Sequence, residues 1–95
     1  MYTISHQLYL DVGERLMDAI GRKEYFSGVV TSYNEDVECR LVCTLIVERE
    51  ANASEGHRLP RISRLIPVWW ECHTYQGEEE ILNDFSFREL ASIIL

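Results

Sequence analysis

The first third of the chain carries a hydrophobic stripe at helical spacing. Apolar residues recur at every fourth position through residues 4–20, with charged residues on the other side of the stripe. This pattern predicts an amphipathic helix. Gly13 weakens it by about 1 kcal/mol relative to alanine. An alternative reading makes residues 7–10 extended and starts the helix near Val12, but the unbroken stripe favours the longer helix.

After this segment the hydrophobic period changes to two, which is typical of strands. Aromatic and β-branched residues dominate 25–33, and apolar positions alternate strictly along 37–49. The segment 62–75 predicts another long strand, and 80–82 a short fourth one. Residues 50–60 have no period and are rich in small and polar residues, so we expect a mobile loop there.

The last part of the chain predicts a second helix. Asp84 or Ser86 can cap it, and Glu89 would complete a capping box with Ser86. Phe87, Leu90 and Ile94 would form its buried stripe. The resulting order is α-β-β-β-(β)-α: an α+β fold with an N-terminal helix, a three- or four-stranded antiparallel sheet and a C-terminal helix. At this length we expect one domain over residues 1–95.

The two long strands can be placed in register if a regular hairpin joins them. Paired residue numbers then sum to 111, which sets Cys39 against Cys72 and Leu41 against Trp70 on one face. Slipping the pairing by one residue would turn this whole face toward solvent, so burial favours the register. Pro67 lacks a backbone N–H and is the position where we expect a bulge to break it.

The opposite, outward face of the sheet is unusually apolar for a face in contact with water. The final helix could cover it, or both helices could pack on the inward face and leave it to another chain. The register of the first hairpin is not fixed by the sequence. Tyr25, Val29 and Tyr33 extend this apolar face only if that register places their side chains on the outward side. The residues predicted to form the interaction surface are Val42, Ile46, Leu65, Trp69, His73 and Tyr75.

Charge restricts the partners of this protein. The chain has 16 acidic and 9 basic residues and a formal net charge of −7, which repels nucleic acid and anionic membranes. No apolar run approaches the length of about 20 residues that a membrane span needs. Acidic residues gather near the two predicted turns at one end, which would suit a basic protein partner. The N-terminus lacks the features of a signal peptide, so we expect a cytoplasmic protein.

The candidate reactive groups favour a structural role. Cys39 and Cys43 share a strand face but lie about 13 Å apart, too far to bind one zinc ion. Cys72 and His73 are adjacent in a strand and point to opposite faces, so the histidine cannot activate the thiol. We therefore expect buried, reduced thiols, no catalytic residues, no metal and no cofactor.

The function that fits these expectations is protein–protein interaction without catalysis. We expect a homodimer, or another homo-oligomer, formed through the outward sheet face. One alternative is an acidic nucleic-acid mimic that inhibits a basic DNA-binding protein. Another is a small-molecule binding domain that uses Trp69, His73 and Tyr75 as a pocket wall.

Overall fold

The structure, a computed structural model, describes residues 1–50 and 60–95 of the chain. It confirms the α+β class and shows four strands between the two helices. Of the mobile loop expected at residues 50–60, residues 51–59 lie outside the described residues. The elements are α1 (His6–Ile20), β1 (Tyr25–Asn34), β2 (Val37–Arg49), β3 (Ile62–Gln76), β4 (Glu79–Ile81) and α2 (Phe87–Ile94).

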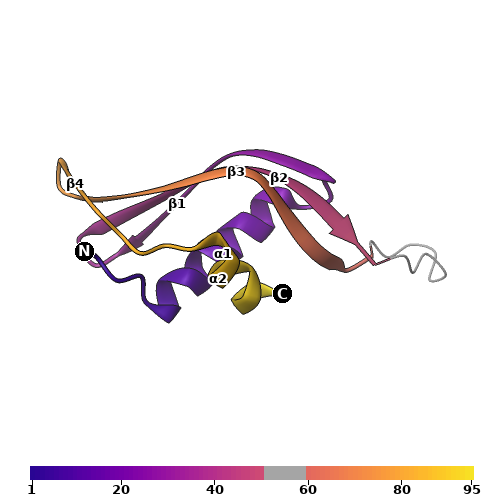
Figure 1. The fold of residues 1–95 in the computed structure, drawn as a ribbon, viewed down its shortest axis with the longest axis horizontal. Coiled ribbons are helices and arrows are strands. Elements are labelled where there is room, and N and C mark those ends of the chain that lie inside the picture. The colour runs from indigo at the N-terminus through magenta and orange to yellow at the C-terminus, as the bar shows by residue number, and fades with distance from the viewer. Residues whose placement is uncertain (51–59) are drawn as a thin grey trace.

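The four strands form an antiparallel sheet in the order β1-β2-β3-β4, with both helices on the same side of it (Figure 1). Helix α1 packs beneath β1 and against α2, and α2 packs beneath β3. No described element lies on the other side of the sheet (Figure 1). Of the two arrangements that the sequence allowed, the one in which the final helix covers the outward face is therefore wrong.

Helix α1 follows the longer of the two sequence interpretations, although it begins at His6. Ser5 caps it, because its Oγ accepts a hydrogen bond of 3.1 Å from the N–H of Leu8. Ile4 precedes the helix and is buried in the core, and its N–H donates to Oδ1 of Asp84 at 2.8 Å. Asp84 thus ties the chain before α1 to the chain before α2.

Helix α2 is capped by Ser86, whose Oγ accepts a hydrogen bond from the N–H of Glu89 at 3.3 Å. The structure thereby selects Ser86 over Asp84 as the capping residue. Phe87 and Leu90 are buried against the sheet, as the apolar stripe predicts. Ile94 is partly buried and packs against the core.

Gly13 allows α1 and α2 to approach closely. A Cβ at this position would lie 2.2 Å from Cγ2 of Ile94. We expect Gly13→Ala to lower the free energy of unfolding by up to about 2 kcal/mol, because overpacking costs about 1–3 kcal/mol and exceeds the helix-propensity gain of about 1. Urea unfolding measures this change. Ile94→Ala in the Gly13→Ala background should recover part of the loss, and a stabilised Gly13→Ala protein would contradict the close approach.

The β2–β3 register agrees with the sequence prediction at one end only. Arg49 pairs with Ile62, as expected from partner numbers that sum to 111. Two irregularities in β3 then leave Ser63 and Val68 without partners, and the partner numbers sum to 113 beyond the second one. The predicted register is therefore wrong over most of the two strands. The second bulge lies beside Pro67, close to where the sequence predicts a break.

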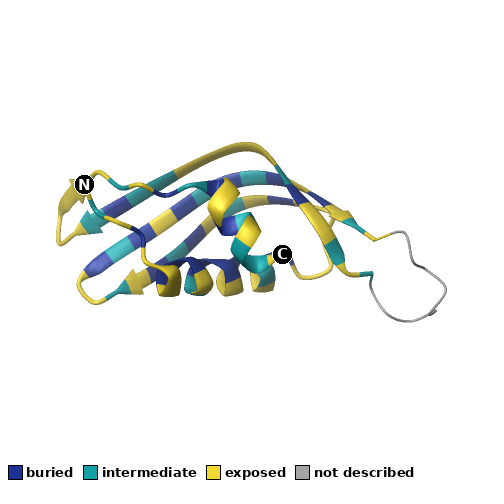
Figure 2. Cartoon of the chain, turned by 60° about the horizontal axis from the view of Figure 1, so that its bottom comes forward, coloured by how far each residue is buried: buried dark blue, intermediate teal, exposed yellow. Residues whose placement is uncertain are grey.

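Each bulge reverses the face on which the following side chains lie. Relative to the predicted register, therefore, only the residues between the two bulges lie on the opposite face. Leu65 pairs with Val47 and is buried in the core, so its predicted place on the outward face is wrong. Ile66 occupies that face instead, opposite Ile46. Figure 2 shows the alternation of buried and exposed positions along the sheet. Trp69 lies beyond the second bulge and keeps its predicted side.

Candidate functional site: the open sheet face

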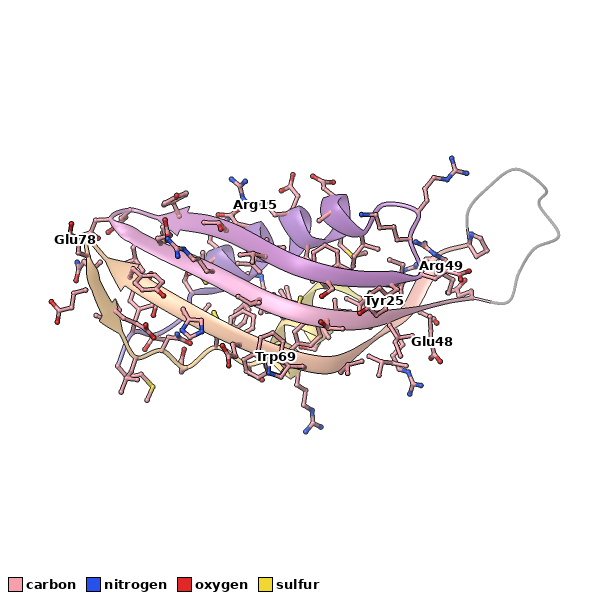
Figure 3. The ribbon with its side chains drawn as sticks, turned by 90° about the horizontal axis from the view of Figure 1, so that it is seen from above. Arg15, Tyr25, Glu48, Arg49, Trp69 and Glu78 are labelled. Atoms are coloured by element: carbon pink, nitrogen blue, oxygen red, sulfur yellow. The ribbon has the colours of Figure 1, made fainter. Side chains whose placement is uncertain are left out.

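The side of the sheet opposite the helices, here called the open face, is built from alternate residues of three strands (Figure 3). The β1–β2 register is regular from Tyr25 opposite Ile46 to Tyr33 opposite Glu38, which settles the first hairpin. The residues of the open face lie in five rows across the sheet: Tyr25, Ile46 and Ile66; Ser27, Thr44 and Trp69; Val29, Val42 and Glu71; Thr31, Arg40 and His73; Tyr33, Glu38 and Tyr75.

The half of the open face nearer to Arg49 is apolar. Trp69 is 47% exposed and Ile46 is 44% exposed, which is high for large apolar side chains. The hydroxyls of Ser27 and Thr44 lie 2.9 Å apart and form a hydrogen bond with each other, so an apolar partner could cover them without breaking a bond to water that has no replacement. We call this region the apolar half, and its members are Tyr25, Val29, Val42, Ile46, Ile66 and Trp69.

The other half of the open face, here the polar half, holds charged and aromatic side chains around a hollow of about 570 Å³. Glu38 accepts a hydrogen bond of 3.0 Å from the Tyr33 hydroxyl and forms an ion pair with Arg40. The Arg40 guanidinium lies 4.8 Å from the ring centroid of Tyr75, a cation–π contact. The polar half consists of Thr31, Tyr33, Glu38, Arg40, Glu71, His73 and Tyr75.

His73 stands between two carboxylates in the polar half. Its Nδ1 lies 3.0 Å from Oε2 of Glu80 on β4, and its Nε2 lies 2.9 Å from Oε2 of Glu71. These hydrogen bonds, with Glu80 contributing most, raise the pKa of His73 above its usual value. His73 in this arrangement therefore holds a proton more strongly than a free histidine.

The cysteines lie on the inward face and not on the open face. Cys39 is opposite Thr74, and its Sγ is 3.5 Å from Sγ of Cys72, a diagonal neighbour on β3. The predicted direct pairing of these two cysteines is therefore wrong, although they do lie on neighbouring strands and in contact. Burial raises the pKa of the Cys43 thiol to about 11, which keeps it protonated and unreactive.

No described residues form a cluster suited to a metal ion. Among residues 1–50 and 60–95, no group of three histidine, cysteine or carboxylate side chains has the necessary geometry. The expectation of a protein without metal or cofactor stays a prediction.

The two acidic turns meet at one end of the sheet. Val37 pairs with Gln76, so the acidic turns at Asp36 and Glu78 lie together at one end. At the other end Arg49 donates hydrogen bonds to the carbonyls of Gly21 and Lys23 (Figure 3). The acidic end agrees with the expectation from the sequence, but nothing in the sequence indicated that Arg49 joins β2 to the end of α1.

The structure brings five of the six predicted interaction residues to the open face and divides them between its halves. Val42, Ile46 and Trp69 belong to the apolar half, and His73 and Tyr75 to the polar half. Leu65 is buried on the inward face. Sequence reasoning placed Ile66 on the inward face, and it gave no indication that Glu80 approaches His73. Glu71 has the spacing of the outward face, because residues two apart in a strand share a face, but its contact with His73 was not predicted.

None of the helices within residues 1–50 and 60–95 is long and apolar enough to cross a membrane. Comparison of the chain with family models, with curated proteins and with solved structures finds no match. The functional interpretation therefore depends on the open face itself.

Proposed function

We propose that this chain is a non-catalytic protein–protein interaction domain that forms a homodimer through its open face. The observation that carries the proposal is the cluster of exposed aromatic and aliphatic side chains on a sheet face that no described element covers. A sheet face in contact with water normally carries polar residues, so an apolar one implies a further layer.

The composition of the open face supports an interface. Trp and Tyr, which protein interfaces favour, stand in the apolar half as Trp69 and Tyr25. The charged side chains at its borders are already paired within the chain: Arg64 with Glu48 at 2.9 Å, and Arg40 with Glu38. A second copy could therefore cover the apolar half without leaving these charges unpaired.

The two edges of the sheet are less suited to association than its face. Helix α1 packs beneath β1 and projects beyond the outer edge of that strand (Figure 3), which blocks a neighbouring strand. The outer edge of β3 is paired with β4 only at Thr74–Gln76. The rest of it carries two bulges and Pro67, features that discourage strand addition.

The size of the open face indicates how much of it a dimer must use. Three strands about 4.8 Å apart and about 33 Å long present roughly 480 Å² in projection, before the relief of the side chains is added. Stable interfaces bury about 800 Å² on each partner. A dimer therefore needs the polar half as well as the apolar half.

We place this dimer in the cytoplasm, and the three free thiols support that location. The end of the sheet that carries Asp36 and Glu78 is available as a second contact for a basic protein partner. Such a contact would be electrostatic, so moderate salt should dissociate it.

Replacing Trp69 by lysine tests the dimer. We expect Trp69→Lys to yield a folded monomer, with the dissociation constant raised at least about thirtyfold, because a central aromatic side chain contributes about 2 kcal/mol or more to an interface. Light scattering coupled to size exclusion measures the mass, and circular dichroism checks the fold.

Leu10→Lys is the matched control, because Leu10 is 38% exposed and lies on α1, on the other side of the sheet from the open face. This variant should remain dimeric. A wild-type protein that is monomeric at high micromolar concentration, or a folded Trp69→Lys protein that still dimerises, would refute the proposed interface.

A further inference from the structure

The contacts of His73 fit only one of its protonation states. Both ring nitrogens lie within hydrogen-bond distance of carboxylate oxygens, from Glu80 and Glu71. A neutral imidazole has one N–H and can donate to one carboxylate, whereas the imidazolium donates to both. When His73 loses its proton, one nitrogen lone pair therefore faces a carboxylate oxygen, which is unfavourable.

The geometry of a dimer would place two such sites opposite each other. In a dimer that uses the full open face, the apolar half of one copy must cover the apolar half of the other. This arrangement requires a two-fold axis parallel to the strands. The polar half of one copy then faces the polar half of the other. We propose that pH regulates this association and that the dimer is favoured when His73 is protonated, an inference that depends on the proposed homodimer.

The sign of the effect follows from the charges around His73. With a neutral imidazole, the carboxylates of Glu38, Glu71 and Glu80 outnumber the Arg40 guanidinium, so each polar half together with Glu80 of β4 has a net charge of −2. Protonation changes this net charge to −1. The product of the two facing charges falls to a quarter, so the repulsion between the copies falls in proportion at a given separation.

The other groups that face His73 do not reverse this sign. On β2, Arg40 lies directly opposite and disfavours the imidazolium, but its charge is paired with Glu38. On β3, the Tyr75 ring stacks on the imidazole at a centroid distance of 6.5 Å. β1 contributes Thr31 to this row and has no charged residue.

Measuring the dissociation constant between pH 6.5 and 9 at constant ionic strength tests the proposal. The pKa of His73 is raised above its usual value, so the scan must extend well above that value to follow the loss of the proton. We expect the dissociation constant of the full chain, measured by sedimentation, to rise about fivefold to tenfold toward pH 9, near the lower end of typical coupling between sites. In 1 M salt, where the Debye length is about 3 Å, the difference should largely disappear.

Three variants test whether the pH dependence comes from His73. His73→Gln should show one pH-independent constant close to that of the wild type at pH 9, and Glu80→Gln should associate at pH 9 more tightly than the wild type. His6→Gln, on the first turn of α1, should keep the full pH dependence. A dimer whose constant does not change with pH, or changes equally in His73→Gln, overturns the regulation alone. A chain that is monomeric at every pH overturns the proposed homodimer as well.

Discussion

Replacing Leu65 by aspartate is expected to prevent the chain from folding. Leu65 is 4% exposed and packs in the core beside Val47. A carboxylate there would be buried without a partner, at a cost of several kcal/mol, in addition to the lost packing of the leucine. A domain of this length has a total stability of about 5–14 kcal/mol. Circular dichroism and urea unfolding should show an unfolded or severely destabilised protein.

Ile66→Asp is the matched control, one position along the same strand. Ile66 lies on the open face opposite Ile46, so its replacement should leave a folded protein that loses less than about 1 kcal/mol. That protein should also be defective in dimerisation. If Ile66→Asp unfolds while Leu65→Asp folds, the stretch between the two bulges has the opposite orientation, which is the one that the uninterrupted register predicts.

This pair of residues shows where the sequence was sufficient and where it was not. Alternation of apolar and polar residues predicted β2 and both of its faces, because every inward position from Val37 to Val47 is apolar. In β3 both faces contain apolar residues, so slipping the pairing by one leaves the pattern almost equally good. The bulges at Ser63 and Val68 therefore could not be located from periodicity. Pro67 indicated the approximate position of one bulge, but it did not indicate that the residues between the bulges would change faces.

The composition of the candidate site was predictable, but its accessibility was not. The sequence identified an apolar outward face, and left open whether α2 would cover it. That choice depends on where α2 docks, which is set by contacts distant in sequence. Gly13 lets α2 pack beside α1 on the inward side, and Phe87 and Leu90 are then buried there. No local pattern in the final helix distinguishes the two sides of the sheet.

The position of Trp70 lowers the expected cost of replacing this residue. The uninterrupted register sets Trp70 opposite Leu41 as a fully buried core residue, whose loss would cost about 3–5 kcal/mol. In the structure Trp70 pairs with Cys43 and is 36% exposed at the outer strand β3. Its ring contacts the Phe85 ring edge-on, at a centroid distance of 5.6 Å.

Because over a third of this residue is already in contact with solvent, we expect Trp70→Ala to cost about 2–3 kcal/mol, including about 1 for the aromatic contact. Leu41 has no exposed surface in the central strand β2, and Leu41→Ala should cost about 3–5 kcal/mol. The smaller side chain should therefore have the larger effect in urea unfolding. The reverse order would show that Trp70 contributes to the docking of α2 beyond its own burial. Both variants should still dimerise where they are folded, because neither side chain lies on the open face, whereas Trp69→Lys, one residue away, should not.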